Sequence, residues 1–375
     1  MYLLLALFSM NFMLLDKYLI TLMFLQQCVR KKILTCDHKI YLLGAFASIY
    51  TVVLYVFSGK IHVGAVMLPV AYLVGYNWEI EEEDPGKTVK TVLICASLGM
   101  CVHVVLNFLW EMIQNRGIVF GARHRDIWSG AVSGATGQMV NLTMCTSVLT
   151  FAVMKRGKYL WLLGLLGIGL IYGAIVGSRT AIMMTLVSAL AGMLILFGSF
   201  RSPNVRKAMV GYAVIVGVLV LVFVNGWFGV SEIVEKSYLL TRIREIIAEN
   251  QSIFSTSRWD LKGEYLRNAV YWPWGGGKLR QMAGGNYAHD LLLDAFSDGG
   301  IFAVGLLAVY LIGWLWDTLA FIRRDGSLEI KVLCFPYLVV MILQMMLEPV
   351  IAGAPVLLLN MALVHGVMKQ AAGGD

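Results

Sequence analysis

Charged residues are scarce in this chain. Lys, Arg, Asp and Glu make up 14% of its 375 residues, and hydrophobic residues make up 59%. Soluble domains average about 25% charged residues, so the composition excludes an ordinary soluble enzyme and predicts an all-α, polytopic membrane protein. Only seven prolines are present, and low-complexity tracts and internal repeats are lacking, which leaves little room for a disordered tail or a repeat architecture.

The predicted outer loops, where a disulfide would form, contain no cysteine. None of the six cysteines lies in the outer loops predicted below; Cys36 lies in an inner loop, and the others lie within or at the ends of predicted spans. This distribution argues against a disulfide framework and against a thiolate metal site.

Apolar stretches of about 20 residues, the length that crosses a bilayer core of about 30 Å, recur along the chain. The predicted spans are residues 2–15, 18–29, 39–58, 61–78, 88–110, 130–154, 159–177, 180–199, 208–227, 299–322, 330–350 and 353–368. The first two are short and form either a tight pair or one long helix that tolerates Asp16 and Lys17, so we predict about twelve spans, or one fewer. The first residues lack a basic leader and a small-residue cleavage site, which predicts a retained anchor. The predicted organisation is nine spans in 1–227, a large outer loop in 228–298 and three spans in 299–375.

Basic residues set the predicted orientation. Sixteen of the 30 Lys and Arg fall on one side, including the clusters at 30–32 and 155–158, and the short loops opposite carry only three. The basic side of a membrane protein faces the cytoplasm, which accounts for the net charge of +7 without nucleic acid. The other 11 lie in two outer segments, 111–129 and 228–288, and predict either an anionic ligand or a solvated surface beside anionic headgroups. Within the longer segment, residues 231–249 predict an amphipathic helix lying on the bilayer.

Two arginines are each predicted to start a helix on the outer face. In "STSRWD" the spacing of Ser257 and Asp260 is that of a capping box, which puts Arg258 in the first helical turn. In "IVGSRTA" Ser178 is the cap and Arg179 begins the next span. A guanidinium beside the unpaired N–H groups of a helix start makes a phosphate site, and two such sites suit a diphosphate. Snorkelling of Arg179 to lipid headgroups is the alternative.

Residues 271–287, "YWPWGGGKLRQMAGGNY", combine aromatic rings, glycines and two cations. Trp272 and Trp274 are predicted either to stack on a sugar or to anchor in the headgroup belt. The glycines allow close approach of the backbone to a ligand, or else serve tight turns. Together with Lys278 and Arg280, this segment is a candidate binding site for a diphosphate or a glycan.

The stretch "NYAHDLLLDAFSDGG" predicts a short helix over about 288–298 that is capped by Asn286 and broken by Gly299–Gly300. His289 then lies in the first turn, where the helix dipole favours the neutral imidazole, and a neutral imidazole can accept a proton from a hydroxyl. The alternative is a structural histidine.

Acidic residues follow the histidine. Asp290, Asp294 and Asp298 recur at every fourth position and form one stripe. We expect this stripe to pair with arginines and not to bind a metal, because no second histidine lies nearby in the sequence. Glu348, in "MLEPV", is the acid closest to a membrane interior, and it is expected either to act there or to pair with an outer arginine. Asp290, Asp294 and Glu348 are candidate supporting acids of the site.

Taken in order, these motifs resemble a known family. "GSRTA" between two spans, "SR" opening a helix in a long outer loop, "PWGGG", and "AHDLLLDAFSDGGIFAVGLL" together resemble the bacterial O-antigen ligase and polysaccharide polymerase superfamily. The resemblance covers roughly residues 111–322, with a weaker likeness in "HRDIWSGAVSGATGQ". The chain departs from the family pattern at Asp290, where Asn more commonly follows the histidine.

The resemblance implies a GT-C-like membrane glycosyltransferase of the bacterial inner membrane, with its active site on the extracytoplasmic face and with no cofactor. Its implied substrates are a glycan on undecaprenyl diphosphate and an acceptor hydroxyl, carried by a second lipid-linked repeat unit in a polymerase or by a lipid A core in a ligase. A chain-length regulator protein is a further implied partner, beside membrane lipid. On this basis Arg179 and Arg258 hold the diphosphate, and His289 acts as the base or orients the acceptor. Arg123 and Arg125, in "GARHRD", are expected to help bind the diphosphate or the glycan.

Two other classes of protein are weighed against this interpretation. A transporter of lipid-linked sugars predicts ionisable residues near mid-span and repeat symmetry, whereas the conspicuous charges here cluster at the predicted outer face. An intramembrane serine protease needs serine and histidine at membrane depth on adjoining helices, and the candidate histidines are His103 inside a span and His289 at an edge. The short chain favours a polymerase over a ligase.

Overall fold

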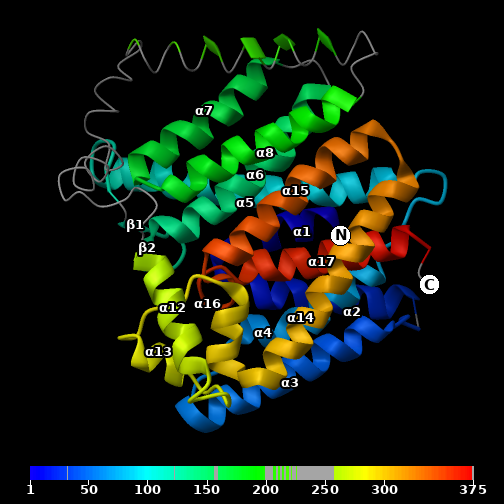
Figure 1. The fold of residues 1–375 in the computed structure, drawn as a ribbon. Coiled ribbons are helices and arrows are strands. Elements are labelled where there is room, and N and C mark those ends of the chain that lie inside the picture. The colour runs from blue at the N-terminus through cyan, green and yellow to red at the C-terminus, as the bar shows by residue number, and fades with distance from the viewer. Residues whose placement is uncertain are drawn as a thin grey trace.

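The computed structural model describes residues 1–31, 33–121, 123–155, 159–198 and 257–373, together with isolated positions between 206 and 225. Its regular elements are helices that lie side by side and one short hairpin (Figure 1). They are α1 (Tyr2–Ser9), η1 (Phe12–Leu14), α2 (Asp16–Lys31), α3 (His38–Ser58), α4 (Val63–Tyr76), α5 (Pro85–Gln114), β1 (Arg123–Arg125), β2 (Val132–Gly134), α6 (Ala135–Lys155), α7 (Tyr159–Val176), α8 (Arg179–Gly198), α12 (Ser257–Ala269), α13 (Lys278–Met282), α14 (Leu291–Asp325), α15 (Leu328–Leu347), α16 (Val350–Gly353) and α17 (Pro355–Ala371).

Within the described residues, four helices are long and apolar enough to cross a membrane: α3, α5, α14 and α15. α3 has 21 residues, which is about 30 Å at 1.5 Å per residue and matches the hydrocarbon core of a bilayer. α4 and most of α8 are shorter apolar helices. The architecture is that of an all-α membrane protein, and the total of about twelve spans stays a prediction. The predicted span 208–227 lies largely, and the predicted surface helix 231–249 wholly, outside the described residues.

The N-terminal region forms two helices instead of one. α1 ends at Ser9, and at about 12 Å its eight residues are too short to cross a membrane alone. Asn11, Met13 and Leu14 have positive φ angles and turn the chain into α2. The prediction of a tight pair is correct, and the prediction of 2–15 as a complete span is wrong.

Two other predicted spans have different limits. Span 130–154 begins later, because β2 occupies its first part and α6 starts only at Ala135. β1 pairs antiparallel with β2, and this hairpin was not predicted. Span 353–368 is preceded by the short helix α16 and begins as α17 at Pro355, because proline is favoured in the first turn of a helix.

α17 lies at the centre of the molecule, and its residues from Val356 to Met368 are buried on every side. It packs against α4, and two glycines allow the close approach. A Cβ on Gly75 would lie 1.9 Å from the carbonyl oxygen of Leu363, and one on Gly366 would lie 2.4 Å from that of Tyr72. Small residues that let helix backbones touch are typical of membrane helix pairs.

α14 packs against α3 and is broken at Gly300, where φ is 75° and ψ is −174°. The predicted break at this glycine is correct. The preceding loop closes on the break, because the N–H groups of Gly276 and Gly277 donate to the carbonyls of Asp298 and Ser297, each at 2.8 Å. The glycines of this loop therefore serve contact with α14. Each of these two has a positive φ, which only glycine adopts freely.

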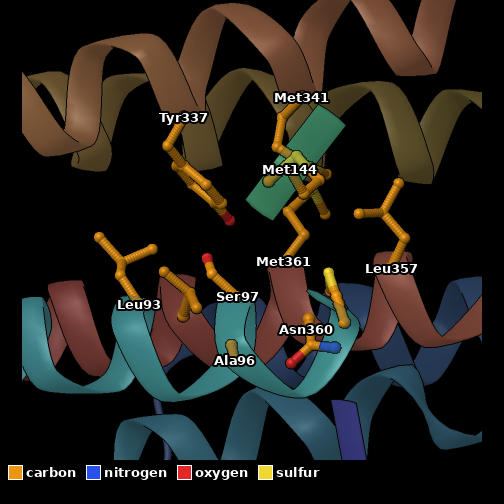
Figure 2. A pocket seen from close by; sticks show the side chains of 11 residues that line it. Leu93, Ala96, Ser97, Met144, Tyr337, Met341, Leu357, Asn360 and Met361 are labelled. Carbon is orange, nitrogen blue, oxygen red and sulfur yellow. The ribbon is translucent and has the colours of Figure 1, made fainter. Parts of the chain in front are cut away.

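A small cavity lies between α5, α6, α15 and α17 (Figure 2). Its volume is about 10 Å³, which holds one water molecule at most. The hydroxyl of Tyr337 points into it and has no hydrogen-bond partner among the described residues. This cavity is too small for an organic substrate, so the candidate site lies elsewhere. The hairpin, α12, α13 and α16 gather at one end of the helices, on the left in Figure 1.

Candidate functional site

Arg258 and Glu348 form an ion pair where α12 begins and α15 ends. Nη1 of Arg258 lies 3.4 Å from Oε1 of Glu348 and donates to the carbonyl oxygen of Leu347 at 2.8 Å. The guanidinium thus meets the negative end of the α15 dipole as well as a carboxylate. Arg258 lies in the first turn of α12, as predicted, and the side chain of Ser257, the predicted cap, lies outside the described residues. The prediction that Glu348 pairs with an arginine of the long loop is confirmed.

The "GSRTA" motif lies beside this pair. Nη1 of Arg258 is 3.4 Å from the hydroxyl oxygen of Thr180, a residue 78 positions away in sequence. The predicted cap is present, because the hydroxyl of Ser178 accepts a hydrogen bond from the N–H of Ala181 at 3.3 Å. Arg179 is the first residue of α8, and its side chain lies outside the described part of the structure. The starts of α8 and α12 therefore lie next to each other, as a two-arginine site requires.

His289 faces the same carboxylate from the other side. Its Nδ1 lies 3.7 Å from Oε2 of Glu348. Both atoms are buried, and neither has a hydrogen-bond partner among the described residues. Buried polar atoms in native proteins are normally hydrogen-bonded. Within the described residues, this cluster of Arg258, His289 and Glu348, called the Glu348 centre below, is therefore incompletely hydrogen-bonded.

The prediction that His289 lies in the first turn of a helix is wrong. His289 precedes α14 and has a φ of 56°, and Asp290 is the N-cap, accepting from the N–H groups of Leu292 and Leu293. Asn286, the predicted cap, instead donates to the carbonyl of Ala283 at 3.2 Å. The aspartate acts as the cap because it directly precedes the apolar run.

Lys262 is a residue of this region that the sequence-based predictions missed. Its Nζ lies 3.2 Å from Oδ2 of Asp290, donates to the carbonyl of Met346 and lies 5.1 Å from the ring centre of Trp259. It follows Arg258 by four positions, so both cations lie on one face of α12. That spacing is the signal in the sequence that identifies it.

The three aspartates of the predicted stripe have separate roles. Asp298 forms an ion pair with Arg280 and accepts from the hydroxyl of Tyr50 at 2.9 Å. Asp290 pairs with a lysine. Asp294 is 4% exposed and accepts from a backbone N–H, that of Ala288, at 2.9 Å. Pairing with arginine is therefore correct for Asp298 and wrong for the other two, because the turn before α14 brings a lysine and a backbone amide to them.

The aromatic and glycine-rich segment is held against the protein by its own side chains. The guanidinium of Arg280 pairs with Asp298 and lies 4.3 Å from the ring centre of Tyr287. Nε1 of Trp272 donates to the carbonyl of Gly275 at 2.6 Å. These contacts give Arg280 and Trp272 a structural role. Trp274 is 57% exposed and Lys278 is half-buried, and their contact with a ligand stays a prediction.

The predicted arginines at 123 and 125 lie in the hairpin. Arg125 is exposed, and the side chain of Arg123 lies outside the described residues. His124, between them, is buried and pairs with Glu111. Their predicted contact with a diphosphate or glycan stays a prediction, and the hairpin lies at the same end of the molecule as α12 (Figure 1).

The turn of the hairpin is ordered by Asp126. This carboxylate lies 2.8 Å from Nε2 of His103 and accepts from the N–H of Ser129 at 2.8 Å. Burial raises the pKa of Asp126, but the hydrogen bonds from His103 and Ser129 outweigh burial and hold that pKa below its usual value. Asp126 is therefore a stable anion in the loop.

No protein-family model matches the chain, and no curated protein is significantly similar to it. The resemblance to the ligase and polymerase superfamily therefore stays a prediction from the sequence motifs, and the site must be argued from its own geometry.

Proposed function

We propose that the protein is a membrane glycosyltransferase that moves a glycan from an undecaprenyl-diphosphate carrier to a sugar hydroxyl. The observation that carries this proposal is the convergence of Arg258, His289 and Glu348 beside the start of α8, which begins at Arg179. Cations at helix starts bind the phosphates of a leaving group. An imidazole next to a carboxylate accepts a proton. The two capacities together fit transfer from a diphosphate donor.

In the proposed reaction, the acceptor oxygen attacks the anomeric carbon of the donor from the face opposite the diphosphate. The bond from that carbon to the diphosphate oxygen breaks, and the electron pair leaves with the diphosphate. Arg258 and Arg179 stabilise the negative charge that develops on the leaving oxygen. The acceptor proton passes to His289, and Glu348 stabilises the resulting imidazolium. One displacement inverts the anomeric centre.

Polymerisation of a surface polysaccharide is the proposed role, in a GT-C-like protein of about twelve spans with its site on the extracytoplasmic face of the bacterial inner membrane. Four long apolar helices within the described residues support the membrane setting. The incomplete hydrogen bonding of the Glu348 centre among the described residues supports a ligand there.

Turnover of the purified protein with a lipid-diphosphate oligosaccharide, alone and with a separate acceptor, tests the proposal. Longer lipid-linked chains are expected. Transfer only to the separate acceptor would identify a ligase. Absence of both products, together with movement of the lipid across vesicles, would overturn the proposal in favour of a transporter.

A further inference from the structure

A second, larger cavity lies at the same end of the molecule, and none of the residues of the Glu348 centre lines it. Its volume is about 400 Å³, within the range of about 300–1,000 Å³ that is usual for small-molecule sites. The turn between α1 and α2, the middle of α5, the hairpin turn, the start of α6 and the start of α17 surround it. Its polar lining includes Asn11, Asp16, His103, Asn107, Asp126 and Gln138.

Part of this lining is held rigidly. Asp126 is fixed by His103 and by the backbone of its own turn. The amide oxygen of Asn107 accepts from the N–H of Ile127 at 2.8 Å, and its Nδ2 lies 3.5 Å from Oδ2 of Asp126. These side chains are therefore preorganised before any ligand arrives.

Other lining groups are buried and lack a partner. Gln138 is 4% exposed; its Oε1 accepts from the hydroxyl of Tyr172, whereas its Nε2 has no partner in the part of the chain that the structure describes. Oδ1 of Asn11 is likewise buried and, within the same described ranges, unpartnered. Gln138 and Asn11 both line the cavity.

Hydrogen-bonding groups of both kinds line the cavity. The carboxylates of Asp16 and Asp126 accept hydrogen bonds, and the amino group of Lys17 donates them. Together with the amides of Asn107 and Gln138, these groups match the hydroxyl groups of a neutral ligand, which both donate and accept.

We propose that this cavity binds a neutral, polyhydroxylated ligand with the chemistry of a sugar. The short helix α16 connects it with the Glu348 centre. The N–H of Val350, its first residue, donates to the carbonyl of Glu348 at 2.9 Å, and Gly353, its last residue, lines the cavity. The assignment of that sugar to the acceptor glycan rests on the proposed function, whereas the binding itself does not.

Gly137 allows the cavity to be filled without disturbing the fold. It lies in α6 at the cavity wall, and the single atom near a Cβ at this position is the carbonyl oxygen of Gly353, at 3.8 Å. A Gly137→Leu side chain would therefore occupy the cavity. Gly305→Leu is the matched control, because Gly305 also lies in a helix, and the space around it is open.

The test is calorimetric titration of the purified full chain with maltose, lactose, chitobiose and, separately, inorganic pyrophosphate. We expect at least one disaccharide to bind the wild type and the Gly305→Leu variant. Gly137→Leu should weaken that binding at least tenfold with an unchanged melting temperature and unchanged pyrophosphate binding. Gln138→Glu, which keeps an oxygen for Tyr172 but removes the amide donor, should also weaken it.

Lack of binding by all three disaccharides, or equal binding by wild type and Gly137→Leu, would overturn the inference. The outcome is separable from that of the proposed function. If the protein binds a sugar but transfers no glycan, the cavity assignment is supported and the proposed glycosyltransferase activity is contradicted. If the protein transfers a glycan but Gly137→Leu leaves the KM for the acceptor unchanged, the activity is supported and the cavity assignment is contradicted.

Discussion

The Glu348 centre and a second cluster near the other end of α14 contain the same three kinds of group. In the second, called the Asp317 cluster, Nζ of Lys39 lies 2.5 Å from Oδ2 of Asp317, and Nε2 of His365 lies 3.0 Å from the same oxygen. Both nitrogens of His365 have partners, and its side chain is 0% exposed. In the Glu348 centre the arginine and histidine side chains are 28% and 26% exposed, and two facing atoms have no partner among the described residues.

The difference separates a structural cluster from a candidate site. In the Asp317 cluster both histidine nitrogens have hydrogen-bond partners, and the ion pairs join α3, α14 and α17. The same groups at a rim, held by helix ends and incompletely paired, can exchange their contacts for those of a substrate. Three changes test this contrast and two test the break in α14, which lies between the two clusters along the chain; they are given from the largest expected effect to the smallest.

His289→Asn should reduce glycosyl transfer about 10²- to 10⁴-fold, because the variant removes the base. Asparagine tolerates the positive φ of this position better than alanine does, so the melting temperature should stay close to that of the wild type. Initial rates over a range of pH are the measurement. Near-normal turnover at every pH would show that His289 is not the base.

Asp317→Ala should lower the free energy of unfolding by about 3–5 kcal/mol, because Lys39 would keep a buried, unpaired charge. Unfolding in detergent micelles measures the loss. The double variant Lys39→Met with Asp317→Leu removes both charges and should recover most of the stability. A loss of less than about 1 kcal/mol in the single variant would show that this ion pair contributes no more to stability than an exposed one.

Arg258→Ala should reduce transfer about 10²- to 10³-fold, the usual effect of removing one donor that stabilises developing charge. Arg258→Lys should recover only part, because the planar fork is lost, and Arg179→Ala should behave like Arg258→Ala. Arg267→Ala is the control, since Arg267 is exposed on the same helix. Equal rates in the Arg258→Ala and Arg267→Ala variants would contradict the assignment.

Gly300→Ala should lower the free energy of unfolding by about 1–3 kcal/mol, because a φ of 75° with a ψ of −174° is essentially restricted to glycine. Its Cβ would also lie 2.6 Å from the carbonyl oxygen of Trp274. Gly305→Ala, in the regular part of the same helix, should be neutral or stabilising. Thermal melting of both variants is the measurement. Equal melting temperatures would show that the break in α14 accepts a Cβ at position 300 without strain.

The smallest effect concerns His62, which lies 3.0 Å from the hydroxyl of Tyr50 and 3.8 Å from Asp298. Burial, followed by the charges of Arg280 and Lys60, lowers the pKa of His62. Only the unfolded chain then takes up a proton just below about pH 6.5. Stability is therefore lost as the pH falls from that value toward the lowered pKa. The melting temperature should drop less between pH 7.5 and pH 5.5 in His62→Gln than in the wild type, and parallel curves would contradict this.

The local features of the site were predictable from the sequence. Scarce charge and long apolar runs predicted a helical membrane protein, and a Ser–Asp spacing predicted a helix with Arg258 in its first turn. The glycine pair predicted the break at Gly300. Each of these depends on backbone chemistry within a few residues, which the sequence displays directly.

The composition of the charge clusters was decided only by the tertiary structure. Arg258 and Glu348 are 90 positions apart, and no local pattern indicates that the end of α15 lies against the start of α12. The cap of α14 was assigned to Asn286 instead of Asp290, although the sequence shows that Asp290 directly precedes the apolar run. Sequence alone determined which charged groups the chain has at the ends of its apolar helices; helix packing determined which of them are paired within the described residues.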